Sequence, residues 1–391
     1  MLQVHRITGE LILEVDTLSA SLELDARGIV TSIKKQIRDK TGISCYRQQL
    51  VCGSNIVEDG SWTLLGRPLQ MHMVVLHMET TNNHPTTMLQ AAVTGDASLM
   101  MPVLQGGQDP NCVDRFLRTA SWHAAAAGHV HILEILYDAC ADIDLPDGRH
   151  ETPLHSAAIA GHADVAEFLL QKRAAINRKN QEGSSALLLA VLNRQAGVVQ
   201  CLLNVSADAN TQRHRERGKT GLMHAAELGR VDLVEMLLAG RADPHLFFSG
   251  WTALSFAAQR GHLEVARLII GQGVSPDAGT HDRWTPLFLA VSTGHADVVS
   301  LLLEKQADKD KQDDDGWTPL LLAAGDGNLD LVRTLVSARA NPRHSNNSGV
   351  TPESLAADRG HSQVIRFFAA WESREEEQLS GTSASESSVG F

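Results

Sequence analysis

The chain has 391 residues, of which 43% are hydrophobic and 20% charged, and its formal net charge is −12. This length is too great for one ordinary core and fits two units or a repeat array. The acidic balance argues against nucleic acid as a partner, because phosphate contacts need clustered Lys and Arg.

The first 76 residues predict a small α+β module. Polar and apolar residues alternate over residues 2–4 and 11–15, which is the pattern of a β-hairpin. Residues 30–37 then follow helical spacing and end at Gly42, and short apolar runs around residues 50–52 and 71–76 predict two further strands. The predicted order is two strands, one helix and two strands.

Three phrases within this segment resemble ubiquitin, whose fold is a β-grasp: Ile37–Ile43, Gln48–Leu50 and Glu58–Gly60. No Gly-Gly ends the segment, and Ser54 stands where ubiquitin has a chain-linking lysine. The resemblance therefore implies a built-in ubiquitin-like domain and not a conjugated modifier. It also implies a receptor-binding patch at Val51, His72 and Val74. The alternative is that these residues pack inward, because strand register is not fixed by the sequence.

A seven-residue phrase, clearest at Thr152–Ala158, recurs at a nearly constant spacing of 33 residues. Its first residue is Thr86, Thr119, Thr152, Ser185, Thr220, Thr252, Thr285, Thr318 or Thr351. The period and the T-P-L-H-x-A core resemble the ankyrin repeat, over about residues 83–371. The resemblance implies an all-α solenoid of about nine repeats that binds proteins on its concave face and finger loops.

The residues of the third repeat favour a pair of short helices. Thr152 suits a helix N-cap, Pro153 the first helical position, and Gly161 the left-handed residue after the helix. A second helix follows, and residues 178–184 then form an exposed finger. Neither helix is long enough to be stable alone, so neighbouring repeats must bury it. In the fourth repeat, Arg194 replaces the glycine, and its first helix should end less sharply.

The chain is thus divided into a ubiquitin-like domain at 1–76, a linker at 77–82, ankyrin repeats at 83–371 and a disordered acidic and Ser-rich tail at 372–391. Five scattered cysteines predict reduced thiols in a cytoplasmic or nuclear protein. No apolar run is long enough to span a membrane, and the N-terminus lacks a signal-peptide core, so we expect no membrane insertion.

The sequence predicts no catalytic residue, cofactor or metal site. Most of its 18 histidines recur with the repeat and receive a structural role. No H-E-x-x-H, G-x-S-x-G or phosphate-binding glycine motif occurs. The aspartate-rich finger near residue 313 lacks the glycine and terminal glutamate of an EF-hand loop.

Finger residues are the first group of candidate binding residues. Aromatic candidates are Phe247 and Phe248, together with Trp251, Trp284 and Trp317, each of which precedes a repeat threonine. The tryptophans have a second interpretation, in which each packs against its own finger. Charged candidates are Arg213, Arg215 and Arg217 in one finger and Asp313, Asp314 and Asp315 in another, where opposed charges could orient a partner or simply be solvated.

Positions just before the glycine that ends each first helix are the second group. In resembling proteins these positions line the concave face. They change along the chain from apolar, at Ile159 and Ala160, to polar and charged, at Glu227, Gln259, Arg260, Asp326 and Arg359. This gradient suits a partner with an apolar part and a charged part, although neutral variation on a solvated surface would look the same.

The functional prediction is a monomeric, non-catalytic scaffold or adaptor for a protein partner. The ubiquitin-like domain would link that partner to ubiquitin receptors or the proteasome. The alternative is an enzyme regulator that acts by steric occlusion, in which the N-terminal domain only caps the array.

Overall fold

The computed structural model describes the backbone of residues 2–6, 11–15, 48–52, 55–56, 69–75, 85–212, 218–280 and 283–386, with side chains in residues 86–374 of these ranges. The chain divides into two compact units, Met1–Ala207 and Asp208–Phe391. Each unit is described by itself.

A five-stranded sheet begins the first unit. Four of its strands overlap the predicted places, and the two-residue strand Asn55–Ile56 was not predicted. The strands are β1 (Leu2–Arg6), β2 (Leu11–Val15), β3 (Gln48–Cys52), β4 (Asn55–Ile56) and β5 (Leu69–Val75). The strand order is β2-β1-β5-β3-β4. β1 pairs in parallel with β5, and the other neighbouring pairs are antiparallel. The helix predicted at residues 30–42 lies outside the described residues.

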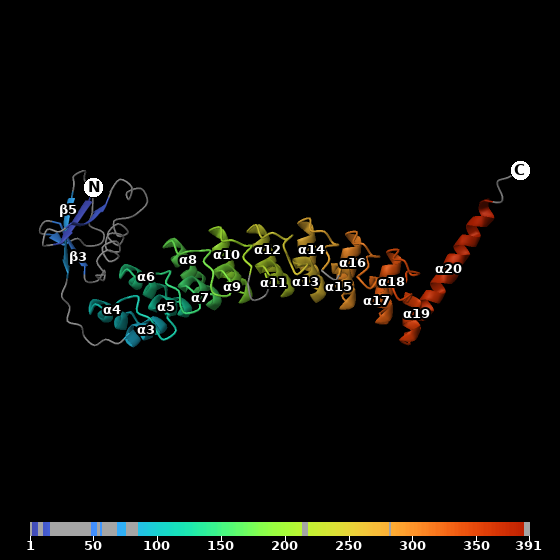
Figure 1. Ribbon diagram of the computed structural model, residues 1–391, viewed down its shortest axis with the longest axis horizontal. Coiled ribbons are helices and arrows are strands. Elements are labelled where there is room, and N and C mark those ends of the chain that lie inside the picture. Colours follow the sequence, from blue (N-terminus) through green and yellow to red (C-terminus); the bar gives the residue numbers. More distant parts are fainter. Residues whose placement is uncertain are drawn as a thin grey trace. The chain divides into compact units, whose positions relative to one another are not determined.

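Helical pairs follow in the rest of the first unit (Figure 1). They are α3 (Pro85–Thr94) with α4 (Ala97–Gln105), α5 (Ala120–Ala127) with α6 (Val130–Asp138), α7 (Pro153–Ala160) with α8 (Ala163–Gln171), and α9 (Ala186–Leu192) with α10 (Ala196–Asn204). Within this unit, α3 packs on α5, α5 on α7, and α7 on α9. Buried alanines such as Ala124 and Ala157 allow this close approach.

The second unit repeats this arrangement with five more pairs. They are α11 (Gly221–Glu227) with α12 (Val231–Ala239), α13 (Ala253–Arg260) with α14 (Leu263–Gly271), α15 (Pro286–Ser292) with α16 (Ala296–Glu304), α17 (Pro319–Gly325) with α18 (Leu329–Ser337), and α19 (Pro352–Asp358) with α20 (Ser362–Glu386). One finger contains a short hairpin, β6 (Phe247–Phe248) and β7 (Trp251–Thr252). The described residues therefore hold the predicted nine pairs.

The repeat threonine acts as the N-cap in most first helices. The Thr318 hydroxyl, for example, accepts the backbone amide of Leu321, which satisfies one of the free amides at the start of α17. The first repeat differs, because α3 already begins at Pro85 and Thr86 lies inside the helix. At the other end, Gly161 has φ 91°, as predicted, and Arg194 takes the same left-handed conformation with φ 61°.

The histidines that follow the helix-ending position join adjacent repeats. Nε2 of His162 lies 3.2 Å from the Ala126 carbonyl oxygen, and Nε2 of His295 lies 3.2 Å from that of Gln259. His129, His262 and His361 make the same contact. The structural role predicted for these histidines is therefore confirmed. Gln195 replaces histidine in the fourth repeat and donates to the Ile159 carbonyl.

Two expectations from composition differ from the structure. The helix α20 continues to Glu386, whereas the sequence predicted a disordered tail from residue 372. Glu, Gln and Ala residues in this stretch favour continuation of the helix. Cys112 and Cys201 are free thiols, but Cys140 forms a disulfide bond. The expectation of five reduced thiols is thus wrong at Cys140, because sequence spacing does not reveal which thiols the fold brings together.

Candidate functional site

A single position controls the shape of most fingers. It lies five residues before the N-cap, and it is occupied by Asp114, Asp147, Asn180, Thr280, Asp313 and Asn346. In each Asp or Asn of this set, one side-chain oxygen accepts the backbone amides two and four residues on, at 2.7–3.0 Å. We call this position the finger tie. Such a tie satisfies amides that would otherwise lie unpaired in a tight loop.

The finger of residues 247–251 has an aromatic residue at the tie position. Phe247 stands five residues before Thr252, and its side chain has no oxygen that could accept the amides of the turn. The turn is instead held by backbone pairing between Phe248 and Trp251, with Ser249 at φ 50° and Gly250 at φ 81°. Two successive residues with positive φ form the tight hairpin turn that suits twisted strands. The Phe247 ring is left 66% exposed, while Phe248 is half-buried.

Trp251 and Trp284 pack within their own repeats. The Trp251 ring centroid lies 5.2 Å from that of Phe256, and the Trp284 centroid 4.8 Å from that of Phe288. Both tryptophans, like Trp317, are half-buried. The structural interpretation of Trp251 and Trp284 is therefore favoured over the interpretation as free anchors.

Glu227 and Arg260 meet on neighbouring first helices of the second unit. The Glu227 carboxylate receives Lys219 Nζ at 2.8 Å and Arg260 Nη2 at 3.1 Å. Burial raises the pKa of Glu227, but the bonds from Lys219 and Arg260 outweigh this effect and lower it. Lys219 also lies 4.4 Å above the Phe256 ring. The structure thus brings the predicted concave residues Glu227 and Arg260 together. Their charges pair with each other and with Lys219, within the protein itself.

The remaining charged candidates are distributed among several contacts. Asp313 is a finger tie, and Asp314 pairs with Arg283 at 3.2 Å. Asp315 is exposed. Arg359 donates to the Gly325 carbonyl and lies 3.7 Å from the Asp326 carboxylate. Gln259 is half-buried.

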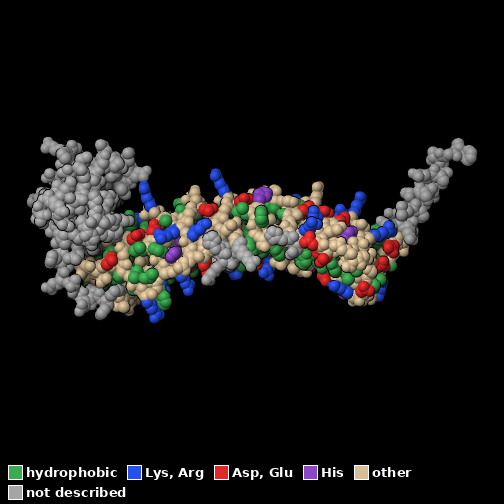
Figure 2. All heavy atoms as spheres, viewed as in Figure 1, with side chains coloured by type: hydrophobic (Ala, Val, Ile, Leu, Met, Phe, Trp, Pro, Cys, Tyr) green, Lys and Arg blue, Asp and Glu red, His purple; other side chains and the backbone are tan. Residues whose placement is uncertain are grey.

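Arg213, Arg215 and Arg217 lie outside the described residues, so the predicted basic finger remains a prediction. On the face seen in Figure 2, acidic, basic and hydrophobic side chains are interspersed.

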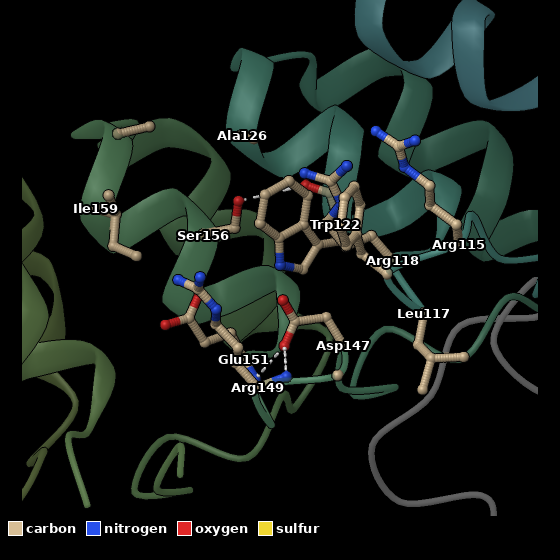
Figure 3. Close-up of a pocket in the computed structure, with 13 residues that line it drawn as sticks. Arg115, Leu117, Arg118, Trp122, Ala126, Asp147, Arg149, Glu151, Ser156 and Ile159 are labelled. Atoms are coloured by element: carbon tan, nitrogen blue, oxygen red, sulfur yellow. Dashed lines mark hydrogen bonds between the residues drawn. The ribbon is translucent and has the colours of Figure 1, made fainter. Parts of the chain in front are cut away.

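Sequence reasoning missed a groove of about 700 Å³ in the first unit (Figure 3). Its apolar wall combines Trp122 and Ala126 of α5 with Ile159 and Ala160 of α7. Its mouth is formed by the finger that carries Phe116 and Leu117. The predicted apolar concave pair, Ile159 and Ala160, is therefore part of a formed groove.

Leu117 holds a conformation that L-residues rarely adopt. Its φ is 62°, and the side chain is 54% exposed. Five other fingers have glycine with positive φ at this position, two residues before the N-cap: Gly183, Gly218, Gly250, Gly316 and Gly349. A side chain in the left-handed region costs roughly 1–2 kcal/mol. His150 and Arg283 take the same conformation at this position of two further fingers, with φ 62° and 59°. An exposed leucine does not recover the conformational cost by burial.

Charged groups frame the groove. Arg118 donates from Nε and Nη2 to Asp114, and its guanidinium lies 4.8 Å from the centre of the Phe116 ring and 5.0 Å from that of Trp122. Burial raises the pKa of Asp114, but hydrogen bonds from Arg118 and Phe116 outweigh it and lower the pKa to about 2. Burial raises the pKa of Glu151.

The Trp122 indole Nε1 is buried and has no hydrogen-bond partner among the described residues. The lining of the groove includes the aromatic residues Phe116 and Trp122.

The N-terminal patch positions come together in the sheet register. Val51 lies opposite His72 in the pairing of β3 and β5, and Gln49 lies opposite Val74. Paired residues share a face of a sheet, as do residues two apart on one strand. The three positions Val51, His72 and Val74 are therefore on one face of the sheet. The receptor-binding patch itself stays a prediction.

The comparison with known families agrees with the helical pairs. A model of ankyrin repeats, comprising three copies, matches four overlapping stretches: residues 88–180, 173–247, 240–313 and 305–376. These stretches cover more than half of the 391 residues. The chain belongs to the ankyrin-repeat family. Ankyrin-repeat proteins are in general non-catalytic interaction modules, which indicates a role in protein–protein interaction.

Within the described residues, no group of three or more His, Cys, Asp or Glu side chains is arranged to hold a metal ion. In the same part of the chain, none of the helices combines the length and apolarity needed to cross a bilayer.

Proposed function

We propose that this ankyrin-repeat protein is a non-catalytic adaptor that holds a protein partner on its apolar fingers and on the adjoining concave face. The supporting observation is the Phe247 finger. Its tie position carries an exposed aromatic ring, although a tying Asp or Asn occupies the same position in five other fingers. Exposed aromatic side chains at the tip of a rigid hairpin make effective anchors, because little conformational entropy is lost when they are buried by a partner.

The groove beside Phe116 and Leu117 supports the same proposal in the first unit. It joins an aromatic wall to a finger tip whose leucine is strained and exposed. A protein segment with an apolar side chain would fill such a groove and cover the leucine. Burial would contribute about 25 cal/mol per Å² of apolar surface before the costs of association.

Proximity labelling in cells tests the role of Phe247. The intact chain is compared with Phe247→Ala and with Val205→Ala, a control that truncates another exposed hydrophobic residue. We expect Phe247→Ala to lose a defined set of labelled proteins and Val205→Ala to retain them. Equal labelling by all three chains would refute the proposal for this finger.

We also propose that the N-terminal module is ubiquitin-like and links the partner to ubiquitin receptors or the proteasome. The strand order, with β1 parallel to β5 at the centre of the sheet, supports a β-grasp. The shared face of Val51, His72 and Val74 supports a receptor patch. Replacing Val51 and Val74 by alanine should weaken binding of the purified chain to purified ubiquitin receptors. Retained affinity would remove this part of the proposal.

The alternative function is an enzyme regulator that acts by steric occlusion, with the N-terminal module as a structural cap. Deletion of residues 1–76 distinguishes a cap from a docking module. A cap predicts a large fall in the melting temperature of the remaining array, whereas a docking module predicts lost partners and nearly unchanged melting.

A further inference from the structure

A second groove, of about 810 Å³, lies between α18 and α20 in the second unit. These are second helices of adjacent repeats, and the groove contains none of the finger or first-helix positions discussed above. Its apolar floor consists of Leu329 and Val336 from α18 and of Phe367 and Trp371 from α20. The aromatic residues are four apart on α20 and therefore lie on one side of that helix.

Three arginines line this groove: Arg333 from α18, and Arg366 and Arg374 from α20. Arg366 and Arg374 are eight residues apart, close to two helical turns, which places both on the same side of α20. A fourth cation, Arg343, does not line the groove, but its guanidinium lies 5.7 Å from the centre of the Trp371 ring. Among the described side chains, no carboxylate lines the groove.

The side chains of Arg333, Arg366 and Arg374 have no hydrogen-bond or ion-pair partner in the described part of the chain. Other arginines of the same unit do have such partners: Arg230 pairs with Asp232, Arg260 with Glu227, and Arg283 with Asp314. Three unpaired guanidinium groups in one groove repel one another in the free protein, and a complementary anion relieves that repulsion. This concentration of positive charge is notable in a chain of net charge −12.

We propose that this groove binds an acidic segment of a partner protein in which carboxylates alternate with apolar side chains. Guanidinium groups pair with carboxylates in bidentate geometry, and Leu329, Val336, Phe367 and Trp371 accept the apolar side chains. The apolar floor distinguishes such a segment from a phosphate polymer or a lipid headgroup, which would leave it uncovered. The groove is a second docking surface, separate from the fingers, and does not depend on the function proposed for them.

Fluorescence anisotropy with the full chain tests this proposal. The probe is a labelled synthetic 16-residue peptide in which two Glu residues alternate with two Leu residues. The charge comparison peptide has Gln in place of Glu, and the apolar comparison peptide has Ser in place of Leu. We expect the acidic-apolar peptide to bind at least about tenfold more tightly than either comparison peptide. Its affinity should also fall as salt is raised, because salt screens charge pairs.

Charge reversal identifies the site. Arg366→Glu and Arg333→Glu should each lower the affinity for the acidic-apolar peptide about tenfold or more. Arg267→Glu is the matched control, because Arg267 is an exposed arginine on α14, outside the groove, and this variant should bind as the parent does. Circular dichroism checks that each variant is folded, and Arg366→Gln, which removes the charge without reversing it, should give a smaller loss than Arg366→Glu.

Three results would overturn the proposal. The first is equal affinity of the parent chain and the Arg366→Glu variant for the acidic-apolar peptide. The second is equal binding of the acidic-apolar peptide and its Ser-for-Leu counterpart, since the floor would then have no role. The third is arginine-dependent binding of single-stranded RNA or of phosphatidylserine vesicles without binding of the peptide, which would make the groove a phosphate site. Because the fingers are unchanged in these variants, failure here leaves the function proposed for Phe247 untouched.

Discussion

Two fingers of the second unit solve the same structural problem differently. In the finger of residues 313–317, the Asp313 carboxylate accepts the amides of Asp315 and Trp317 and holds the turn. In the finger of residues 247–251, the equivalent residue is Phe247, and the turn depends on backbone pairing and on Gly250. In the first finger, the residue at the tie position stabilises the turn. In the second finger, the side chain at the tie position does not hold the turn and is free to contact a partner.

This difference separates positions that the repeat determines from positions that it leaves available. Leu117 in the first unit shares with Phe247 an exposed apolar side chain at a finger, although the Leu117 finger is itself tied by Asp114. Substitution of a tie residue should therefore reduce stability, and substitution of an exposed apolar finger residue should not. Four predictions test this division, from the largest expected change in the free energy of unfolding to the smallest.

The largest effect concerns pH and the tied finger of residues 180–184. His155 is 1% exposed; its Nδ1 accepts a bond from Thr152, so Nε2 carries the proton donated to the Ser184 carbonyl. Burial lowers the pKa of His155 to about 4. Protonation is thus easier in the unfolded chain, and stability present above the ordinary pKa of 6.5 is lost as pH falls toward 4.

The expected loss is on the order of 3 kcal/mol by pH 4. Urea unfolding of the parent and of His155→Gln at pH 7 and pH 4.5 measures it. The Gln variant should start less stable and change less between the two pH values. Identical pH dependence in both chains would contradict the assignment to His155.

Loss of a finger tie is the next effect. Asp313→Ala leaves the amides of Asp315 and Trp317 without their acceptor and should cost about 1–2 kcal/mol. Asp313→Asn retains a side-chain oxygen and should cost less. Chemical denaturation of both variants gives the values, and no difference between Ala and Asn would show that the tie does not hold this finger.

The strained leucine gives a smaller effect of opposite sign. Leu117→Gly removes a side chain from the left-handed region and should stabilise the chain by up to about 1 kcal/mol. Thermal unfolding measures this gain, and Gly183→Leu at the equivalent position of a tied finger should show a loss of similar size. A destabilised Leu117→Gly variant would mean that Leu117 contributes to packing.

The smallest effect is expected at Phe247. Phe247→Asn exchanges an exposed ring for a residue that can form a tie, so the free energy of unfolding should change by no more than about 0.5 kcal/mol or rise. Phe256→Ala is the comparison, because Phe256 is a buried aromatic residue on the following helix and its loss should cost about 3–5 kcal/mol. A loss of that size for Phe247→Asn would show that the Phe247 side chain stabilises the fold and is not free to bind a partner.

Most of the repeat architecture could be predicted from the sequence because its signals are local. Thr152, Pro153 and Gly161 each act within one helix, through a cap, a fixed φ or a positive φ, and the spacing of 33 residues repeats these signals. Arg194 shows the limit of the argument. The fold imposes the left-handed conformation there even without glycine, which no local preference would predict.

The candidate binding surfaces were harder to predict from the sequence, because they depend on contacts between repeats. Phe247 and the pair Ile159–Ala160 could be found from their positions in the repeat. The groove beside Phe116 forms only when residues of neighbouring repeats meet, such as Trp122 and Ser156. A local signal did exist, since a leucine occupies the left-handed position where several fingers have glycine.

The central claim is that a partner protein covers the Phe247 finger, and site-specific photocrosslinking tests it most directly. A benzophenone amino acid is placed at position 247 in one chain and at position 205 in another, and both are irradiated in living cells. We predict a discrete crosslinked protein at 247 that is absent at 205. No crosslink at 247, or the same products at both positions, would contradict the account.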